Sequence, residues 1–207
     1  MKKPIPETTR SLILDAAWNL MEVSGRQDIG MAEIAQAAGV SRQTLFYAFG
    51  NRSGLLLAMV RHKDSKTDHV ARLMEYRDIP VTPASFLAFV GVWLDYLPIV
   101  YPVAILLDAV AVTDADAAQA IGDRMKGALR AGLRRQLGQI ALHYGLHHGP
   151  DPQQLADQVW SLVHPQAWRL LVVECGWTAE NFRRNRLAQI AGWLPDTAAP
   201  PAASGYG

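Results

Sequence analysis

The chain has 207 residues, of which 50% are hydrophobic and 19% charged, and its formal net charge is +1. Such a composition can fill a core in one large or two small domains, so it excludes a disordered chain. The single cysteine, Cys175, excludes an internal disulfide and a cysteine-based metal site, as expected of a cytoplasmic protein.

Membrane insertion and export are not expected. The charge-free stretch at residues 96–107 in the apolar middle is shorter than the ~20 residues of a spanning helix, and Pro98 and Pro102 interrupt it. Glu7, Arg10 and Asp15 also appear too early for a signal peptide.

Charge is distributed unevenly along the chain. Residues 1–63 contain eight Lys or Arg and five Asp or Glu, and residues 34–63 contain no acidic residue at all. A polyanion can therefore approach this segment without repulsion.

Apolar residues recur at helical spacing along most of the chain. Near the N-terminus, glycines and polar caps punctuate predicted helices at about residues 12–24, 32–38, 41–49 and 55–76. After a linker marked by Pro80 and Pro83, further helices are predicted at about residues 84–97, 102–112, 116–145, 153–174 and 179–194. No strand alternation is found.

The residues around Gly39 have the order that a helix-turn-helix requires. Ala35 is small where two helices must approach, Gly39 accepts positive φ in the turn, and Val40 and Leu45 are apolar where the angle closes. Because Val40, Leu45 and Phe49 then point inward, the outer face of the third helix carries polar residues at its N-terminal end. The predicted DNA-binding residues are Ser41, Arg42, Gln43, Thr44, Tyr47 and Arg52.

These residues suit different parts of a DNA duplex. Arg42 can donate two hydrogen bonds to guanine, and Gln43 can pair with the N6 and N7 atoms of adenine. Thr44, Tyr47 and Arg52 suit phosphate oxygens. Singly, each has an ordinary explanation, such as a solvated charge for Arg42 or a partly buried ring for Tyr47. Their combination with the glycine turn and the Ser41 cap favours nucleic-acid binding.

Residues 10–60 resemble the TetR family of bacterial transcriptional regulators. The resemblance rests on Ile-Leu-Asp-Ala-Ala at 13–17, Met-Ala-Glu-Ile-Ala-Gln-Ala-Ala-Gly-Val-Ser at 31–41 and Thr-Leu-Phe-Tyr at 44–47, about a quarter of the chain in all. It implies an all-helical homodimer that binds double-stranded DNA, with a variable C-terminal domain that binds a small effector and releases the DNA.

The sequence also departs from the pattern of that family. Gly30 replaces a capping threonine or serine, so we expect a weaker cap on the second helix. Gln43 replaces a frequent small residue and adds a base reader, and Arg52 keeps the charge of a usual lysine. Phe46 and Ala48 stand where tyrosine or histidine is frequent, so fewer phosphate contacts are expected.

We therefore predict an all-α fold with an N-terminal three-helix helix-turn-helix module and a C-terminal helical bundle. The expected domains are residues 1–52 for DNA binding, 53–194 for effector binding and dimerisation, and 195–207 as a flexible tail. The fourth helix, from Asn51 towards Tyr76, is expected to link the module to the bundle.

The helix predicted near residues 153–174 has two apolar stripes, which require two partners. One stripe can face the core of its own domain and the other a second subunit. The last helix completes this four-helix interface through Phe182, Leu187, Ile190, Trp193 and Leu194. Pro165 cannot donate to Ser161, so a kink is expected there.

Aromatic and polar residues of the middle helices are the effector-binding candidates, although most of them also suit an ordinary core. They are Trp93, Tyr96, Tyr101, Asp108, Trp160, His164 and Trp168. A buried carboxylate at Asp108 requires a partner, either an effector or a structural arginine or helix N-terminus. A mostly apolar effector is expected, with Asp108 or His164 fixing one polar end.

Other functions are supported less well. His143, His147 and His148 with Asp151 invite a metal site, but the adjacent Gly145, Gly149 and Pro150 favour a helix end, so no metal and no cofactor is expected. A helical-bundle enzyme using Asp108 or a histidine lacks a nucleophile elbow, a phosphate loop or a carboxylate pair. A protein-interaction module remains the other alternative.

Overall fold

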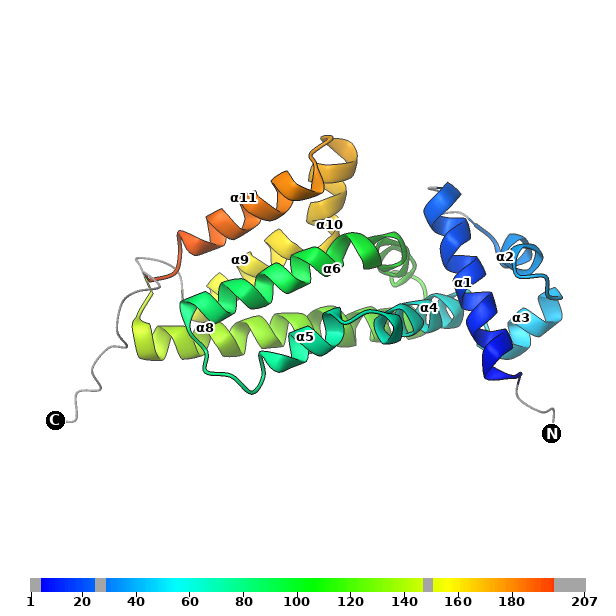
Figure 1. The fold of residues 1–207 in the computed structure, drawn as a ribbon, viewed down its shortest axis with the longest axis horizontal. Coiled ribbons are helices and arrows are strands. Elements are labelled where there is room, and N and C mark those ends of the chain that lie inside the picture. The colour runs from blue at the N-terminus through cyan, green and yellow to red at the C-terminus, as the bar shows by residue number, and fades with distance from the viewer. Residues whose placement is uncertain (1–4, 25–28, 147–150, 196–207) are drawn as a thin grey trace. The chain divides into compact units, whose positions relative to one another are not determined.

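The computed structural model describes residues 5–24, 29–146 and 151–195, and the regular elements in these ranges are all helical (Figure 1). The predicted all-α fold class is confirmed. Of the expected tail at 195–207, residues 196–207 lie outside the described residues, as do the histidines His147 and His148. The elements are α1 (Glu7–Ser24), α2 (Met31–Ala37), α3 (Arg42–Phe49), α4 (Arg52–Lys66), α5 (His69–Glu75), α6 (Pro83–Val110), α7 (Ala115–Ile121), the π-helical η1 (Gly122–Arg130), α8 (Ala131–Tyr144), α9 (Pro152–Val163), α10 (Pro165–Trp168), the π-helical η2 (Arg169–Glu174) and α11 (Ala179–Ala191).

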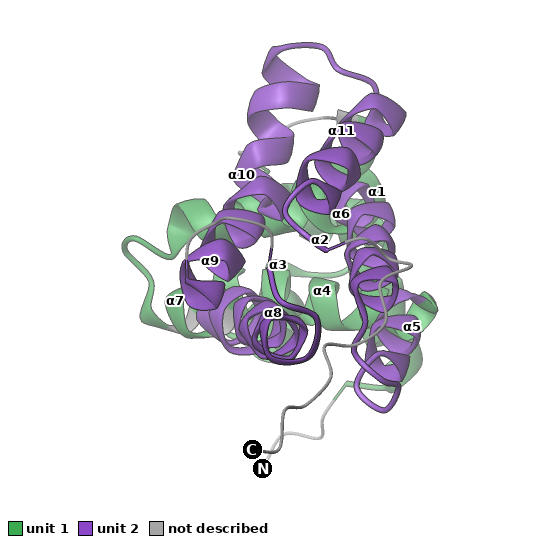
Figure 2. Cartoon of the chain, turned by 90° about the vertical axis from the view of Figure 1, so that its left-hand side faces the viewer, with its two compact units in different colours: residues 1–68, 100–121 green, residues 69–99, 122–207 purple. Residues whose placement is uncertain are grey.

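The chain divides into two compact units, shown in different colours in Figure 2. Unit 1 comprises residues 1–68 and 100–121, and unit 2 comprises residues 69–99 and 122–207. Helix α6 contributes to both units, since the boundary falls within it. The expected domain boundary after residue 52 stays a prediction.

The core of unit 1 is formed by α1 to α4 and by the C-terminal part of α6. Helix α1 places Ile13, Ala17 and Met21 in this core, each at most 3% exposed, at the four-residue spacing of one helix face. Ser53, at the start of α4, donates a hydrogen bond of 2.6 Å to Asp114 Oδ2, just before α7. The first and last segments of unit 1 are thereby joined.

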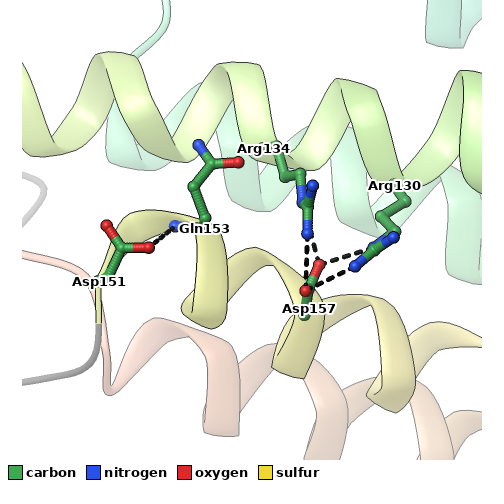
Figure 3. A network of polar contacts seen from close by, with 5 residues as sticks. All are labelled: Arg130, Arg134, Asp151, Gln153 and Asp157. Carbon is green, nitrogen blue, oxygen red and sulfur yellow. Dashed lines mark hydrogen bonds and ion pairs between the residues drawn. The ribbon is translucent and has the colours of Figure 1, made fainter.

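In unit 2, an arginine pair holds α9 against the preceding helices. The carboxylate of Asp157 on α9 accepts two hydrogen bonds from Arg130 and two from Arg134, at 2.7–3.1 Å (Figure 3). The Arg130 guanidinium, followed by that of Arg134, holds the pKa of Asp157 far below its ordinary range. Such bidentate, charge-assisted bonds fix the register of α9 on η1 and α8.

Helix α6 corrects the prediction of separate helices at 84–97 and 102–112. It runs for 28 residues through Pro98 and Pro102, which flank the boundary between the units. Each proline removes one backbone hydrogen bond. Burial of neighbouring side chains offsets this loss, since Leu97, Val100 and Val103 are 0–3% exposed.

The unbroken α6 also bears on the membrane prediction. By length and composition alone it could cross a membrane, with a mean hydropathy of 1.8 in its most apolar 18-residue window. However, 72% of that window is buried inside the protein, as in the core helix of a soluble domain.

The predicted helix from residue 55 to about 76 is wrong, because it breaks at Thr67. Thr67 is extended, with φ −120° and ψ 152°, so α4 ends at Lys66 and α5 starts at His69. The run Ser65-Lys66-Thr67-Asp68 favours this break, because β-branched and short polar side chains are weak helix formers. The helix predicted to link the module to the bundle is thus replaced by α4, which belongs to unit 1, and α5, which belongs to unit 2.

Pro165 ends a helix where only a kink was expected. His164 is extended, with ψ 148°, α9 stops at Val163, and Pro165 is the first residue of α10. Proline suits a first helical position because its missing N–H has no helical partner there. The His164 ring caps the new helix, since Nδ1 accepts a hydrogen bond of 3.2 Å from the Gln166 amide.

Candidate functional site

The turn between α2 and α3 has the geometry that its sequence predicts. Gly39 adopts φ 65°, and the Val40 amide donates to the Ala35 carbonyl at 3.0 Å. Ser41 then caps α3, because its Oγ accepts a hydrogen bond of 3.0 Å from the Thr44 amide. These local bonds set where α3 begins.

The buried face of α3 determines which side chains face outward. Leu45 is 0% and Phe49 7% exposed, while Arg42 and Gln43 are exposed at the N-terminal end. Tyr47 is exposed as well, at 45%. Three of the predicted DNA-binding residues thus share the outer surface of α3.

The other predicted DNA-binding residues are positioned differently. Ser41 is exposed but engaged as the cap, and its Oγ lies 2.8 Å from the hydroxyl of the half-buried Thr44. Arg52 is half-buried in the first turn of α4 and is engaged within the protein. Their side chains are therefore less available to a ligand than those of Arg42 and Gln43.

The cap on α2 is reduced, as Gly30 predicts. Gly30 supplies no side-chain acceptor, but its amide donates to Glu33 Oε1 at 3.3 Å, which keeps half of a capping box. Phe46, which replaces a frequent tyrosine or histidine, is 42% exposed next to Tyr47. Phe46 can make apolar contact with a thymine methyl or a sugar.

Arg10 on α1 is a residue that the motif analysis missed. Its Nη1 donates a hydrogen bond of 3.1 Å to the Ala48 carbonyl in the last turn of α3, and its guanidinium lies 4.5 Å from the centre of the Phe49 ring. A cation at a helix C-terminus is favourable. Because 38 residues separate the partners, no local pattern could have indicated this contact.

A second link from α1, this time to α4, is centred on Asp15. Asp15 accepts hydrogen bonds from Lys66 Nζ at 2.7 and 2.8 Å and lies 2.9 Å from His62 Nε2. Lys66, helped by His62, holds the pKa of the Asp15 carboxyl below its ordinary value. This cluster fixes the C-terminal half of α4 on α1.

Between these two links, α1 and α4 enclose an open cleft of about 400 Å³. Its lining mixes charged and apolar side chains from both helices and consists of Glu7, Arg10, Leu14, Gly54, Leu57, Ala58, Arg61, His62 and Ser65. The cleft belongs to unit 1, and none of the residues predicted to bind an effector lines it.

The predicted effector residues are divided between the two units. Tyr101 and Asp108 belong to unit 1, and Asp108 is half-buried and already has a partner within the protein. The remaining five belong to unit 2, where they form aromatic contacts: Trp93 with Tyr96 at 6.2 Å, Trp160 with His164 at 5.2 Å, and Trp168 with Phe182 at 5.2 Å between ring centres.

Trp93 also has a structural role that the sequence did not indicate. It is 6% exposed, and its Nε1 donates a hydrogen bond of 2.8 Å to the Val163 carbonyl. Because α9 ends there, the Ala167 amide bonds to His164 instead of continuing the ladder to Val163. Trp93 thus satisfies a carbonyl orphaned by the helix break.

Comparisons with known proteins agree with this geometry. Residues 13–59 match the family model described as bacterial regulatory proteins, tetR family. Over 72 residues the chain is 32% identical to the HTH-type transcriptional regulator TtgR of Pseudomonas putida. The match spans 35% of this chain and about a third, 34%, of the length of that relative.

Solved structures extend the likeness to nearly the whole fold. A TetR transcription regulator from Haloarcula marismortui is similar with a TM-score of 0.68 and 15% identity, over 91% of this chain and 100% of its own. FadR from Bacillus subtilis, solved with stearoyl-CoA, is similar with a TM-score of 0.64 and 17% identity, over 87% of this chain and 96% of its own. At such identities the likeness concerns the fold, while the motif match concerns the DNA-binding module. Together they support a DNA-binding helix-turn-helix of the TetR type at residues 13–59, in a chain whose fold is similar to that of TetR-family regulators.

Proposed function

We propose that the chain is a cytoplasmic repressor that binds a pseudo-palindromic operator as a homodimer and is released by a small, mostly apolar effector. The observation that carries this proposal is the exposed N-terminal end of α3. Arg42 and Gln43 are exposed there, while Leu45, in the next turn of the helix, is fully buried. A helix held in this way can enter the major groove with its base-reading side chains leading.

Local electrostatics support the same surface. No acidic residue lies between Glu33 and Asp64, so the segment that contains α3 and the start of α4 presents only basic charges. The amides of the first turn of α3 add the positive end of a helix dipole. Both features attract phosphate groups.

Dimerisation is proposed through the outward surfaces of the last helical segments. The apolar residues expected to form this interface are revised. Phe182, Ile190 and Leu194 are at most 4% exposed within a single chain, so they cannot supply a second interface. Leu170 and Val173 on η2 remain 50% and 58% exposed. A second copy covering these residues would remove a surface unfavourable in water.

Effector binding is proposed in the C-terminal part, where the aromatic residues of unit 2 lie. The stearoyl-CoA bound to the similar FadR supports a ligand with a long apolar part. Release of DNA requires that the ligand bind better to the conformation with lower DNA affinity, since equal affinity for both states shifts nothing.

The test is selection of DNA from a random pool by the purified protein, followed by binding measurements over a range of salt concentrations. We expect an inverted repeat with half-sites ~34–36 Å or a longer multiple apart. Arg42→Ala should cost ~1–3 kcal/mol at one half-site position and relax the preference there. Arg135→Ala, an exposed arginine on α8, is the matched control and should leave binding unchanged.

Two outcomes would contradict the proposal. One is retained sequence preference in Arg42→Ala, which would mean that another face of α3 reads the bases. The other is a monomer mass by light scattering at micromolar concentration, which would exclude the symmetric operator.

A further inference from the structure

The three nearby arginines of α11 show an unusual pattern of charge pairing. Arg183 pairs with Asp95 at 2.6 Å, and Arg184 lies 3.8 Å from Glu180, although the two arginine side chains are 43% and 70% exposed to water. Arg186 is only 9% exposed and forms no ion pair with any described residue. The most buried of the three arginines therefore has no carboxylate beside it among the described residues, although burial makes an unpaired cation most costly.

The position of Arg186 within α11 excludes a simple surface role. The buried residues of this helix are Phe182, Arg186 and Ile190, spaced four apart on the face that packs inward. The Arg186 guanidinium lies 5.5 Å from the centre of the Phe182 ring, which also contacts Trp168 edge-on. Arg186 is therefore a buried cation next to the aromatic pair Phe182 and Trp168.

The hydrogen bonds of Arg186 are incomplete in a way that fits an anion. Nε is buried and has no hydrogen-bond partner in the described part of the chain, and Nη2 donates to Asn185 Oδ1 at 2.8 Å. Asn185 is exposed, so its neutral amide oxygen can turn away and leave Nε and Nη2 to a better acceptor. A carboxylate matches two parallel N–H donors of one guanidinium.

We propose that Arg186 binds the carboxylate of a small amphipathic ligand whose apolar part contacts Phe182 and Trp168. This proposal rests on the proposed effector response and names the polar group of the effector. It replaces Asp108 and His164 as the residues expected to fix the polar end. Burial without a counter-charge also lowers the pKa of Arg186, in agreement with an unsatisfied cation.

A small ligand is favoured over a carboxylate from a second copy of the chain. Arg186 lies on the same inward stripe as Phe182 and Ile190, both 0% exposed, whereas a second copy can approach only the outward faces. The neighbouring carboxylates of unit 2 are already used, since Asp95, Glu174 and Glu180 each lie within ion-pair distance of another arginine.

The experiment uses octanoate as the probe and neutral octanamide as its analogue of equal length. Binding is measured by calorimetry on the full chain, with Arg186→Met as the variant and Arg184→Met as the matched control on the same helix. The wild type and Arg184→Met should prefer octanoate by about tenfold or more, as a charge-assisted pair of hydrogen bonds predicts. Arg186→Met should bind both probes alike.

The melting temperature of the free protein provides a second readout. Because Arg186→Met removes an unpaired buried charge, it should melt no lower than the wild type. If it fails to fold, Arg186→Gln and Arg186→Lys replace it, and Arg186→Lys should keep only part of the preference, because it has lost the planar fork.

Three results would overturn the proposal: a wild type without preference for octanoate, an Arg186→Met variant that keeps the preference, or one that becomes monomeric with unchanged octanoate binding. The last would assign the missing carboxylate to a second copy. DNA binding is measured separately, so a protein that binds octanoate through Arg186 but no DNA would refute the proposed function alone.

Discussion

Arg10 on α1 donates a hydrogen bond of 3.1 Å to the carbonyl of Ala48, in the last turn of the helix whose N-terminal end carries Arg42 and Gln43. The same guanidinium lies over the ring of Phe49. The first helix of the chain thus determines the orientation of α3 from the end opposite to its exposed N-terminus.

Arg10→Ala should weaken the binding of all DNA sequences by roughly tenfold, because loss of the hydrogen bond and of the ring contact, ~1 kcal/mol or more together, frees the C-terminal end of α3. The dependence of affinity on salt should stay unchanged, which fluorescence anisotropy at several salt concentrations would check. Arg10→Lys, which keeps the charge, should recover part of the loss. A slope reduced by ~1 would instead identify Arg10 as a phosphate contact.

Gly54→Ala should destabilise unit 1 by ~2 kcal/mol or more, measured by urea unfolding. A Cβ at this position would lie 2.1 Å from the Phe49 carbonyl oxygen, a backbone atom that cannot move without shifting α3. Gly138→Ala on α8 is the control, since its Cβ would meet nothing within 4 Å, and it should stabilise by up to ~1 kcal/mol. Equal stability of the two variants would contradict the close approach of α3 and α4.

Asp15→Asn should remove a contribution to stability that depends on pH. Because Lys66 and His62 lower the pKa of Asp15 in the folded state, the stabilisation is complete above the unfolded pKa, ~3.9, and is lost as the pH falls through the lower folded value. The side chain is 43% exposed, so the difference from wild type should stay below ~1 kcal/mol. Urea unfolding at pH 6 and pH 3 should show this difference shrinking on acidification, and growth of the difference would refute the cluster.

Trp93→Phe should cost ~1–3 kcal/mol, because the Val163 carbonyl loses its donor at a buried site. Trp160→Phe offers a close comparison, since the buried Nε1 of Trp160 has no hydrogen-bond partner among the described residues. It should cost less, again by urea unfolding. The reverse order would mean that the capping of α9 by Trp93 contributes little to stability.

Features set by neighbouring residues were predictable from the sequence. The turn at Gly39, the Ser41 cap and the inward positions of Leu45 and Phe49 all follow from contacts within a few residues, and they are confirmed. They were sufficient to identify the outer face of α3. Which of its residues contact DNA stays a prediction.

Features set by tertiary packing were not predictable in this way. A proline usually ends a helix, but Pro98 and Pro102 remain inside α6 because the residues before and after them are buried by packing in the two units. The break at Thr67 depends on weak helix formers whose effect is decided by packing. The lack of an ion-pair partner for Arg186 could not be predicted from the sequence. It depends on tertiary packing, in which the carboxylates pair with other arginines, as Asp95 does with Arg183.

The continuity of α6 limits how this chain can exchange segments with others of the same fold. Val103, Ile105 and Leu107 belong to the core around the DNA-binding helices, although more than 30 residues of unit 2 lie between them and α4. A chimaera joined once, after residue 68, would pair its helix-turn-helix with foreign residues at these positions. Recombination that preserves this core must therefore exchange two separate segments, residues 1–68 and 100–121, so changes in DNA specificity are more accessible by substitutions on α3 than by domain shuffling.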